Sequence, residues 1–462
     1  MRRQCTALTA ETIVTDASLP LQPGAKAALG MSTFAFTACF AVWTVFSIIG
    51  IRIKQELGLT EAEFGLLAGT PILTGSLIRV PLGIWADQMG GRLVNLAVML
   101  SAAVATWLLS YAHTYPQFLL AALGVGLAGG SFSVGVAYVS KFFSKARQGT
   151  ALGVFGAGNV GAAVTKFAAP FVMLAFGWQA VAQVWATALA IIAGAYFLVT
   201  RDDPELVARR RTGAKATPAL MQLEPLKRLQ VWRFALYYFF CFGAFVALSL
   251  WLPHYLVAVY HLPLITAGML AAAYSIPGSL FRVFGGWLSD RIGARRVMYI
   301  TFGVSVACTF LLSYPATTYV VDGIEGPITF RLALGLVPFV GLLFALGFAM
   351  SLGKAAVYKH IPVYYPDTIG SVGGLVGMIG GLGGFVLPIA FGALNDLTHI
   401  WTSCFMLLFL LVAGALAWMH LAIGRMERAR TPGLRDLPEL PEMIDLNPTG
   451  AAGAASALRA AE

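Results

Sequence analysis

The chain has 462 residues, of which 58% are hydrophobic and only 11% are charged. Soluble domains carry about a quarter charged residues, so this composition and a mean hydropathy of +0.78 exclude a soluble protein and predict an integral membrane protein. The net charge of +10 does not indicate a nucleic-acid partner, because the basic residues gather in loops between apolar segments.

Twelve apolar segments are long enough to span a bilayer, since a spanning helix needs about 20 residues. No strand-type alternation is present, so helices are expected to satisfy the backbone within the bilayer. The fold class predicted is an all-α membrane protein whose twelve transmembrane helices are centred near residues 42, 74, 102, 128, 160, 188, 244, 276, 305, 345, 381 and 411.

The distribution of Lys and Arg predicts the orientation. Basic residues follow the second, fourth, sixth, eighth and twelfth segments and precede the first, whereas Arg52 and Lys54 are exceptions. Both termini should therefore lie in the cytoplasm, with the chain in the cytoplasmic (inner) membrane. The expected organisation is a cytoplasmic segment, a six-helix half, a charged linker, a second six-helix half and a cytoplasmic tail, at residues 1–30, 31–200, 201–230, 231–424 and 425–462.

The two halves repeat one another. The stretch "RVPLGIWADQMGGR", which begins at Arg79, aligns with "RVFGGWLSDRIGAR", which begins at Arg282. A second pair, "GNVGA" from Gly158 and "GGLGG" from Gly380, aligns at a slightly larger offset. Repeated halves of this kind are typical of transporters that rock two domains around a site at the midplane of the bilayer.

These motifs also carry a resemblance to a known family. The G-x-x-x-D-x-x-G-x-[RK] loops after the second and eighth segments resemble the signature of the major facilitator superfamily. "GVFGAGNVGAAVTKFAAP" and "GGLVGMIGGLGGFVLP" resemble the two glycine-rich signatures of the NarK-type nitrate/nitrite porters. The resemblance covers residues 31–424 and implies an alternating-access transporter of nitrate or nitrite, without enzymatic activity, cofactor or metal.

Arg79 and Arg282 are the central candidates for substrate binding. Each lies eight residues before the Asp of its loop motif, about 12 Å along a helix, which predicts a mid-depth position. An arginine there costs about 2.5–3.5 kcal/mol, and no acidic residue falls inside an apolar segment to offset it. A guanidinium pair suits a planar oxyanion. The alternative is that each arginine pairs with backbone carbonyls or extends to the membrane surface. The resemblance implies that the two arginines bind the anion.

Three further residues are candidates for the same site. Asn159 is polar at mid-helix and flanked by glycines, so its amide could donate to an anion or to a neighbouring helix. Phe132 and Tyr238, with Phe242 one turn beyond, would ordinarily be packing residues. The resemblance implies that Asn159, Phe132 and Tyr238 lie near the anion.

Two lysines are candidates for proton coupling. Lys166 follows Asn159 by seven residues and shares its helix face, and Lys354 aligns beside the repeat counterpart of Phe132. A third cation beside a monovalent anion is excessive unless it can release its proton, and the alternative is that the lysines extend to the surface. The motifs around them resemble the nitrate/proton symporter branch, so proton-coupled uptake is expected, with nitrate/nitrite antiport by the same site as the alternative.

The loop motifs that contain Asp87 and Asp290 are expected to act as gates. Cytoplasmic salt bridges would form in one orientation and break in the other, and the residues expected to make them are Asp87, Arg92, Asp290 and Arg295. The expected partners are a nitrate or nitrite anion, protons and the lipid bilayer, with the protein a monomer. An enzyme or a sensor is disfavoured because no nucleophile cluster or soluble domain is visible, and a cation or drug porter would need a buried carboxylate.

Overall fold

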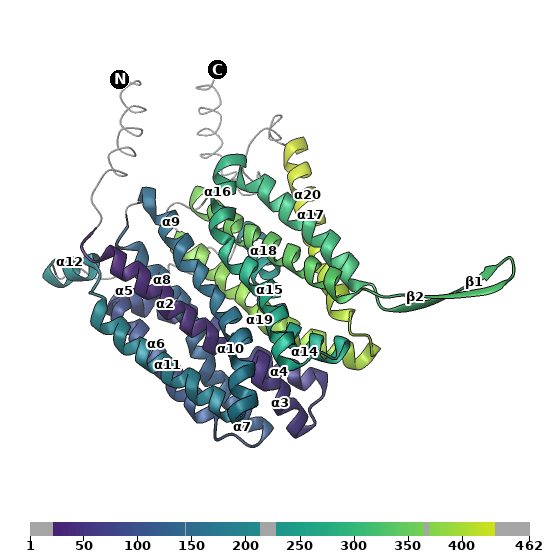
Figure 1. Ribbon diagram of the computed structural model, residues 1–462. Coiled ribbons are helices and arrows are strands. Elements are labelled where there is room, and N and C mark those ends of the chain that lie inside the picture. The colour runs from purple at the N-terminus through teal and green to yellow at the C-terminus, as the bar shows by residue number, and fades with distance from the viewer. Residues whose placement is uncertain (1–21, 144, 213–227, 365–368, 430–462) are drawn as a thin grey trace.

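The computed structural model describes residues 22–143, 145–212, 228–364 and 369–429 (Figure 1). Most of the predicted N-terminal segment, the middle of the linker and most of the tail lie outside these residues. The described part of the N-terminal half contains ten α-helices and two short 3₁₀ turns, namely Ala25–Trp43 (α2), Phe46–Leu57 (α3), Glu61–Leu77 (α4), Arg79–Met89 (α5), Gly91–Leu109 (α6), Tyr115–Val125 (α7), Gly126–Gly130 (η1), Ser131–Ser140 (α8), Lys145–Gly156 (α9), Ala157–Val160 (η2), Gly161–Phe176 (α10) and Trp178–Val199 (α11).

A short helix, Pro204–Thr212 (α12), follows the first half. The C-terminal half then consists of Leu229–Tyr238 (α13), a π-turn at Phe239–Ala244 (η4), Phe245–Tyr260 (α14), Leu264–Leu280 (α15), Arg282–Ile292 (α16), Ala294–Ser313 (α17), Thr317–Gly323 (β1), Gly326–Leu332 (β2), Leu336–Tyr364 (α18), Ile369–Thr398 (α19) and Ser403–Ala429 (α20).

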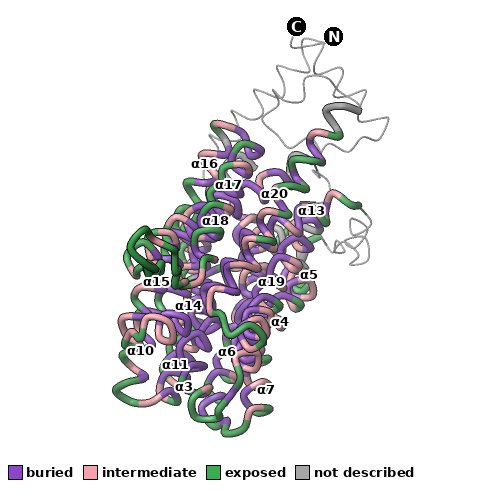
Figure 2. The backbone as a smooth tube through the Cα atoms, turned by 90° about the vertical axis from the view of Figure 1, so that its right-hand side faces the viewer, coloured by how far each residue is buried: buried purple, intermediate pink, exposed green. Residues whose placement is uncertain are grey.

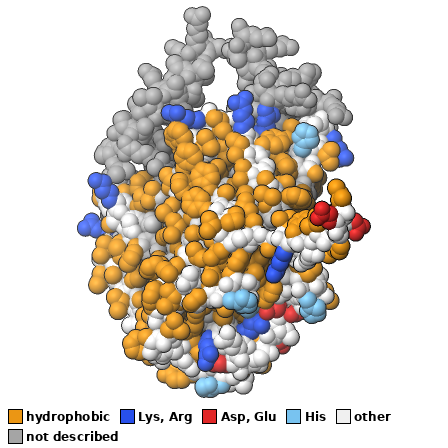
Figure 3. All heavy atoms as spheres, turned by 45° about the vertical axis from the view of Figure 1, so that its right-hand side comes forward, with side chains coloured by type: hydrophobic (Ala, Val, Ile, Leu, Met, Phe, Trp, Pro, Cys, Tyr) orange, Lys and Arg blue, Asp and Glu red, His pale blue; other side chains and the backbone are white. Residues whose placement is uncertain are grey.

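The predicted helical membrane fold is confirmed. In the described part of the chain, 11 helices are long and apolar enough to cross a membrane. The remaining predicted segment, near residue 74, is divided at Ile78 into α4 and α5. Apolar side chains cover the middle of the bundle on the face shown in Figure 3, and charged side chains lie mostly toward its two ends. Such a continuous exposed apolar surface is typical of a lipid-facing protein.

The two ends of the bundle differ, and we name them by their contents. The start of α2, the turns after α5 and α16 and the end of α20 lie at one end, here called the motif end (Figure 1). The turns between α3 and α4 and between α14 and α15 lie at the opposite end, here called the far end. The halves meet along α4 with α19 and α10 with α15, and buried residues run through this interface (Figure 2).

The β1–β2 hairpin is a feature that the sequence did not predict. Its strands are antiparallel, with Tyr319 opposite Phe330 and Val321 opposite Ile328, and the two aromatic rings stack at 5.3 Å. β-branched and aromatic residues on both sides of the turn, among them Tyr319, Val320, Ile328 and Phe330, favour strands. The hairpin projects away from the helices (Figure 1).

Candidate functional site

Arg79 and Arg282 are brought together in the interior of the described bundle. Their exposed fractions are only 4% and 8%. The Cζ atom of Arg79 lies 5.3 Å from the centre of the Phe132 ring, and that of Arg282 lies 5.8 Å from the same ring. Both guanidinium groups therefore lie near the ring of Phe132. The N-terminal half contributes Arg79, and the C-terminal half contributes Arg282.

Further aromatic residues surround the two arginines and form what we call the aromatic cage. Arg79 lies 5.8 Å from the ring of Trp43 and 5.4 Å from that of Phe242, and Arg282 lies 5.6 Å from that of Tyr358. Tyr238 stacks on Phe242 at 5.2 Å and meets Tyr358 edge-on at 4.9 Å. Aromatic faces attract cations but carry no net charge. The cage, which consists of Trp43, Phe132, Tyr238, Phe242 and Tyr358, therefore leaves the two positive charges unneutralised.

The glycine-rich motifs let each arginine approach the opposite half. A Cβ atom at Gly156, in the N-terminal half, would lie 3.1 Å from Nη1 of Arg282. A Cβ atom at Gly381, in the C-terminal half, would lie 3.4 Å from Nη1 of Arg79. Arg79 Nη1 also donates a 2.8 Å hydrogen bond to the carbonyl oxygen of Gly377. The alternative of carbonyl pairing therefore holds for one nitrogen of Arg79.

Several polar atoms at the site have no hydrogen-bond partner among the described residues. They are Nε of Arg79, Nη1 of Arg282 and both amide atoms of Asn159. Asn159 follows Gly156 by three residues through the 3₁₀ turn η2, and residues at this spacing share a face, so we expect its side chain on the side that meets Arg282. Unpaired buried donors are costly, and an anion with several acceptor oxygens would pair with the three donors, which are the two guanidinium nitrogens and Nδ2 of Asn159.

Irregular helix geometry is concentrated at this site. The helices break at Ile78 and Phe281, immediately before Arg79 and Arg282. Asn159 lies in a 3₁₀ turn, and Phe242 lies in the π-turn η4. Short 3₁₀ and π segments often occur at functional positions, and here the two breaks occupy matching positions in the repeat.

No acidic side chain pairs with the arginines among the described residues. The described pairs with acidic side chains involve Arg52, Lys54, Arg92, Lys141 and His254, and neither Arg79 nor Arg282 is among them. The site thus contains two buried guanidinium groups with unpaired N–H donors beside the aromatic cage. Such an arrangement can bind a small anion.

Lys166 is bound inside the protein and does not extend to the surface. Its Nζ atom donates to the Ala162 carbonyl at 3.2 Å, to Ser249 Oγ at 2.5 Å and to Ser275 Oγ at 2.9 Å. The two serines belong to α14 and α15 of the C-terminal half. Lys166 therefore links the two halves, and its three hydrogens are all used.

Lys354 is also fully buried, so the alternative of a surface-extending side chain does not hold for it either. Its Nζ atom donates a 2.6 Å hydrogen bond to the Gly278 carbonyl and lies 3.3 Å from the centre of the Phe245 ring. Gly278 precedes Arg282 by one helical turn. Lys354 therefore lies close to the arginine pair, within the C-terminal half.

The predicted gating residues are only partly visible. The side chains of Asp87 and Asp290 lie outside the described residues, and Arg295 is buried. Arg92 donates to the Phe197 carbonyl at 2.6 Å and pairs with Asp202 at 3.7 Å. These partners connect the loop motif to the segment before α12, a contact that the sequence did not predict, and the gating roles stay predictions.

Sequence reasoning missed Trp43 and Tyr358. Trp43 donates its indole N–H to the Pro71 carbonyl and had no distinguishing feature in its apolar segment. Tyr358 follows Lys354 by four residues, so it shares a helix face with a residue that the sequence did single out. That spacing was the available signal.

A pair of glycines on α19 offers a sharp test of this geometry. A Cβ atom at Gly377 would lie 2.7 Å from the Tyr358 hydroxyl, whereas one at Gly374 meets nothing within 4 Å. Overpacking of this kind costs about 1–3 kcal/mol. We therefore expect Gly377→Ala to weaken anion binding by about tenfold and Gly374→Ala to leave it unchanged, as measured by calorimetric titration of the purified protein with nitrate. Equal affinities in both variants would exclude Tyr358 from the site.

Comparisons with known proteins agree with this architecture. The family model of the Major Facilitator Superfamily matches residues 31–337. A relative from Thermus thermophilus named "Probable nitrate/nitrite antiporter NarK1" is 42% identical over 90% of this chain and 95% of its own. The "Probable nitrate/nitrite transporter NarK2" of Mycobacterium tuberculosis is 32% identical over 81% of this chain and 90% of its own. The "Nitrite extrusion protein" of Bacillus subtilis is 29% identical over 82% and 90%.

Among solved structures, a bacterial homologue of the human lysosomal transporter Spinster, in an inward-facing conformation, superimposes with a TM-score of 0.63. It is 15% identical and covers 95% of this chain and 93% of its own, so it shows the fold alone. With the fold, the repeated loop motifs and these relatives together, the chain is a transporter rather than an enzyme and belongs to the major facilitator superfamily, within its family of NarK-type porters.

Proposed function

We propose that this protein carries nitrate, or nitrite, across the cytoplasmic membrane by alternating access, as a monomer, and couples uptake to protons. The observation that carries the proposal is the arginine pair, Arg79 and Arg282, around Phe132 with no acidic partner among the described residues. The names of the relatives, which are nitrate/nitrite transporters and antiporters, support the same substrate class.

The geometry of the two guanidinium groups favours a planar oxyanion over a spherical anion. Guanidinium is a planar fork donor that matches two oxygens of a nitrate or nitrite ion side by side. The free Nε of Arg79 and the free Nη1 of Arg282 belong to different halves, so one anion with three oxygens would connect them. Asn159 would donate its amide hydrogens to the same anion, and Phe132 and Tyr238 would form the walls.

Proton coupling rests on Lys354 and Lys166. Both are fully buried lysines close to, or linked with, the elements proposed to hold the anion. A lysine that releases its proton on one side of the membrane would let the anion and the proton move together. Nitrate/nitrite exchange through the same arginine pair is the second candidate, because the Thermus thermophilus relative is named an antiporter.

The orientation proposed places the motif end, and with it both termini, in the cytoplasm. Arg92 and Lys141 lie at this end, and both interact with acidic residues before α12. The excess of Lys and Arg in short loops on one side of a membrane marks the cytoplasmic side. The far end then faces the outside of the cell.

Uptake into proteoliposomes tests the proposal. Vesicles that contain the purified protein and no internal nitrite should accumulate nitrate when the external medium is more acidic than the interior. Accumulation that requires internal nitrite and ignores the proton gradient would support exchange instead. No uptake of either anion under any gradient would contradict the proposed substrate class.

A further inference from the structure

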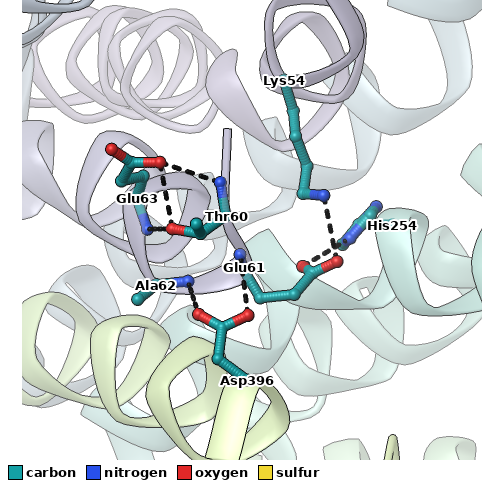
Figure 4. A network of polar contacts seen from close by, with 7 residues as sticks. All are labelled: Lys54, Thr60, Glu61, Ala62, Glu63, His254 and Asp396. Atoms are coloured by element: carbon teal, nitrogen blue, oxygen red, sulfur yellow. Dashed lines mark hydrogen bonds and ion pairs between the residues drawn. The ribbon is translucent and has the colours of Figure 1, made fainter. Parts of the chain in front are cut away.

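A cluster of charged residues joins the two halves at the far end of the bundle, away from the arginine site. We call it the outer node, and it consists of Lys54, Glu61, His254 and Asp396 (Figure 4). Lys54 and Glu61 belong to α3 and α4 of the N-terminal half, and His254 and Asp396 belong to α14 and α19 of the C-terminal half. None of these residues was a predicted site residue.

Glu61 is the centre of the node. Its Oε1 atom lies 3.0 Å from Nζ of Lys54, and its Oε2 atom lies 2.8 Å from Nε2 of His254. The side chains of Glu61 and His254 are only 14% and 9% exposed. The contact with Lys54 is within one half, whereas the contact with His254 crosses the interface between the halves.

Asp396 makes the reciprocal contact. Its two carboxylate oxygens accept hydrogen bonds from the backbone N–H groups of Glu61, at 3.2 Å, and Ala62, at 2.9 Å. These are the first two amides of α4, which have no partner within a helix, and a carboxylate is favoured at a helix N-terminus. Thr60 and Glu63 complete the cap from within α4. Each half therefore contributes one carboxylate that contacts the other half. Glu61 of the N-terminal half contacts His254, and Asp396 of the C-terminal half contacts the start of α4.

The backbones of α4 and α19 touch directly beside the node. Cβ atoms at Gly65 and Gly392 would collide with the backbone of Pro388 and with that of Glu61. Deeper toward the centre, Lys166 bonds to Ser249 and Ser275 across the same interface. The two halves are thus joined by charged contacts at the node, by close backbone packing and by lysine–serine hydrogen bonds.

We infer that the outer node is the external gate of the carrier, in which Glu61 and Asp396 hold the halves together while the far end is closed. The inference rests on the alternating access proposed above, because an anion entering from the far end requires the halves to separate there. That separation must break Glu61–His254 and must expose the first amides of α4. The node then loses hydrogen bonds to charged groups, which contribute more than hydrogen bonds between neutral groups.

A labelling experiment in the full-length protein tests the gate. Ser76 lies on α4 and faces Gly381 of α19 near Arg79, so Ser76→Cys reports whether water reaches the centre from outside. The five native cysteines are replaced, the protein is reconstituted in vesicles, and a membrane-impermeant thiol reagent is added to the external side, in the absence of nitrate. Glu61→Gln and Asp396→Asn should each raise the labelling rate by about tenfold, the effect of losing one hydrogen bond to a charged group.

Glu56→Gln is the matched control. Glu56 also lies at the far end and pairs with Arg52 at 3.0 Å and with the Trp178 indole at 3.2 Å, but all three belong to the N-terminal half. Glu56→Gln should therefore leave the labelling rate of Ser76→Cys unchanged. Rates in Glu61→Gln and Asp396→Asn equal to that of Glu56→Gln would overturn the gate.

Two further measurements separate this inference from its premises. Retained nitrate binding by Glu61→Gln shows that this variant is folded. If Glu61→Gln loses nitrate binding, His254→Gln takes its place, because it breaks the Glu61–His254 contact from the C-terminal half. If the unmodified protein transports no nitrate but labelling still rises in both node variants, the proposed substrate fails and the gate stands.

Discussion

Replacing Arg79 by lysine is expected to abolish most nitrate transport even though the positive charge is kept. Lysine cannot reproduce the planar fork that donates to Gly377 and directs Nε toward the site. Loss of one hydrogen bond between charged partners costs about 1.5–3 kcal/mol, which corresponds to a loss of about 10- to 100-fold in affinity. Titration of the purified variant with nitrate, together with uptake into proteoliposomes, measures the effect.

Arg52→Lys is the matched control for Arg79→Lys. Arg52 is exposed and pairs only with Glu56 one helical turn away among the described residues, and exposed pairs of this kind are worth little. It should transport at the rate of the unmodified protein. Unchanged nitrate affinity in Arg79→Lys would show that the anion binds elsewhere.

Replacing Lys354 by glutamine is expected to separate anion movement from proton movement. Glutamine can still donate to the Gly278 carbonyl but cannot take up or release a proton. Net uptake driven by a proton gradient should therefore be lost, whereas exchange of internal for external nitrate, which needs no net proton movement, should persist. Counterflow of labelled nitrate measures the second process in the same vesicles.

Lys26→Gln serves as the control for Lys354→Gln, because Lys26 is exposed at the start of α2. It should keep both activities. Proton-driven uptake by Lys354→Gln at the original rate, with the same dependence on pH, would remove Lys354 from the coupling mechanism and leave Lys166 as the candidate.

Much of the fold followed from two sequence patterns, because each has one physical cause. Apolar segments without strand-type alternation are expected to be helical in a bilayer, where the backbone must pair within the segment, and this predicted the spanning helices but not the breaks at Ile78 and Phe281. The repeat predicted that Arg79 and Arg282 occupy matching places, and the structure brings both to Phe132.

The details that the sequence did not reveal depend on contacts between distant helices. Nothing in the local sequence of Trp43 distinguishes a cage residue from an ordinary packing aromatic. The role of Gly377 depends on Tyr358, which lies on another helix. The outer node was missed because Glu61 and Asp396 are acids at helix ends, which resemble any surface residue until their partners are known. The β1–β2 hairpin depends on pairing that hydropathy does not measure.

The way in which each arginine lies against the glycine motif of the opposite half has a further consequence. Each half supplies one arginine and the glycine that the arginine of the other half approaches. Under the proposed function, an anion that bridges Arg79 and Arg282 binds only the arrangement in which the two halves are docked, and it stabilises that arrangement by mass action. Anion binding and docking of the two halves are then linked equilibria, which is the property that distinguishes a carrier from a channel.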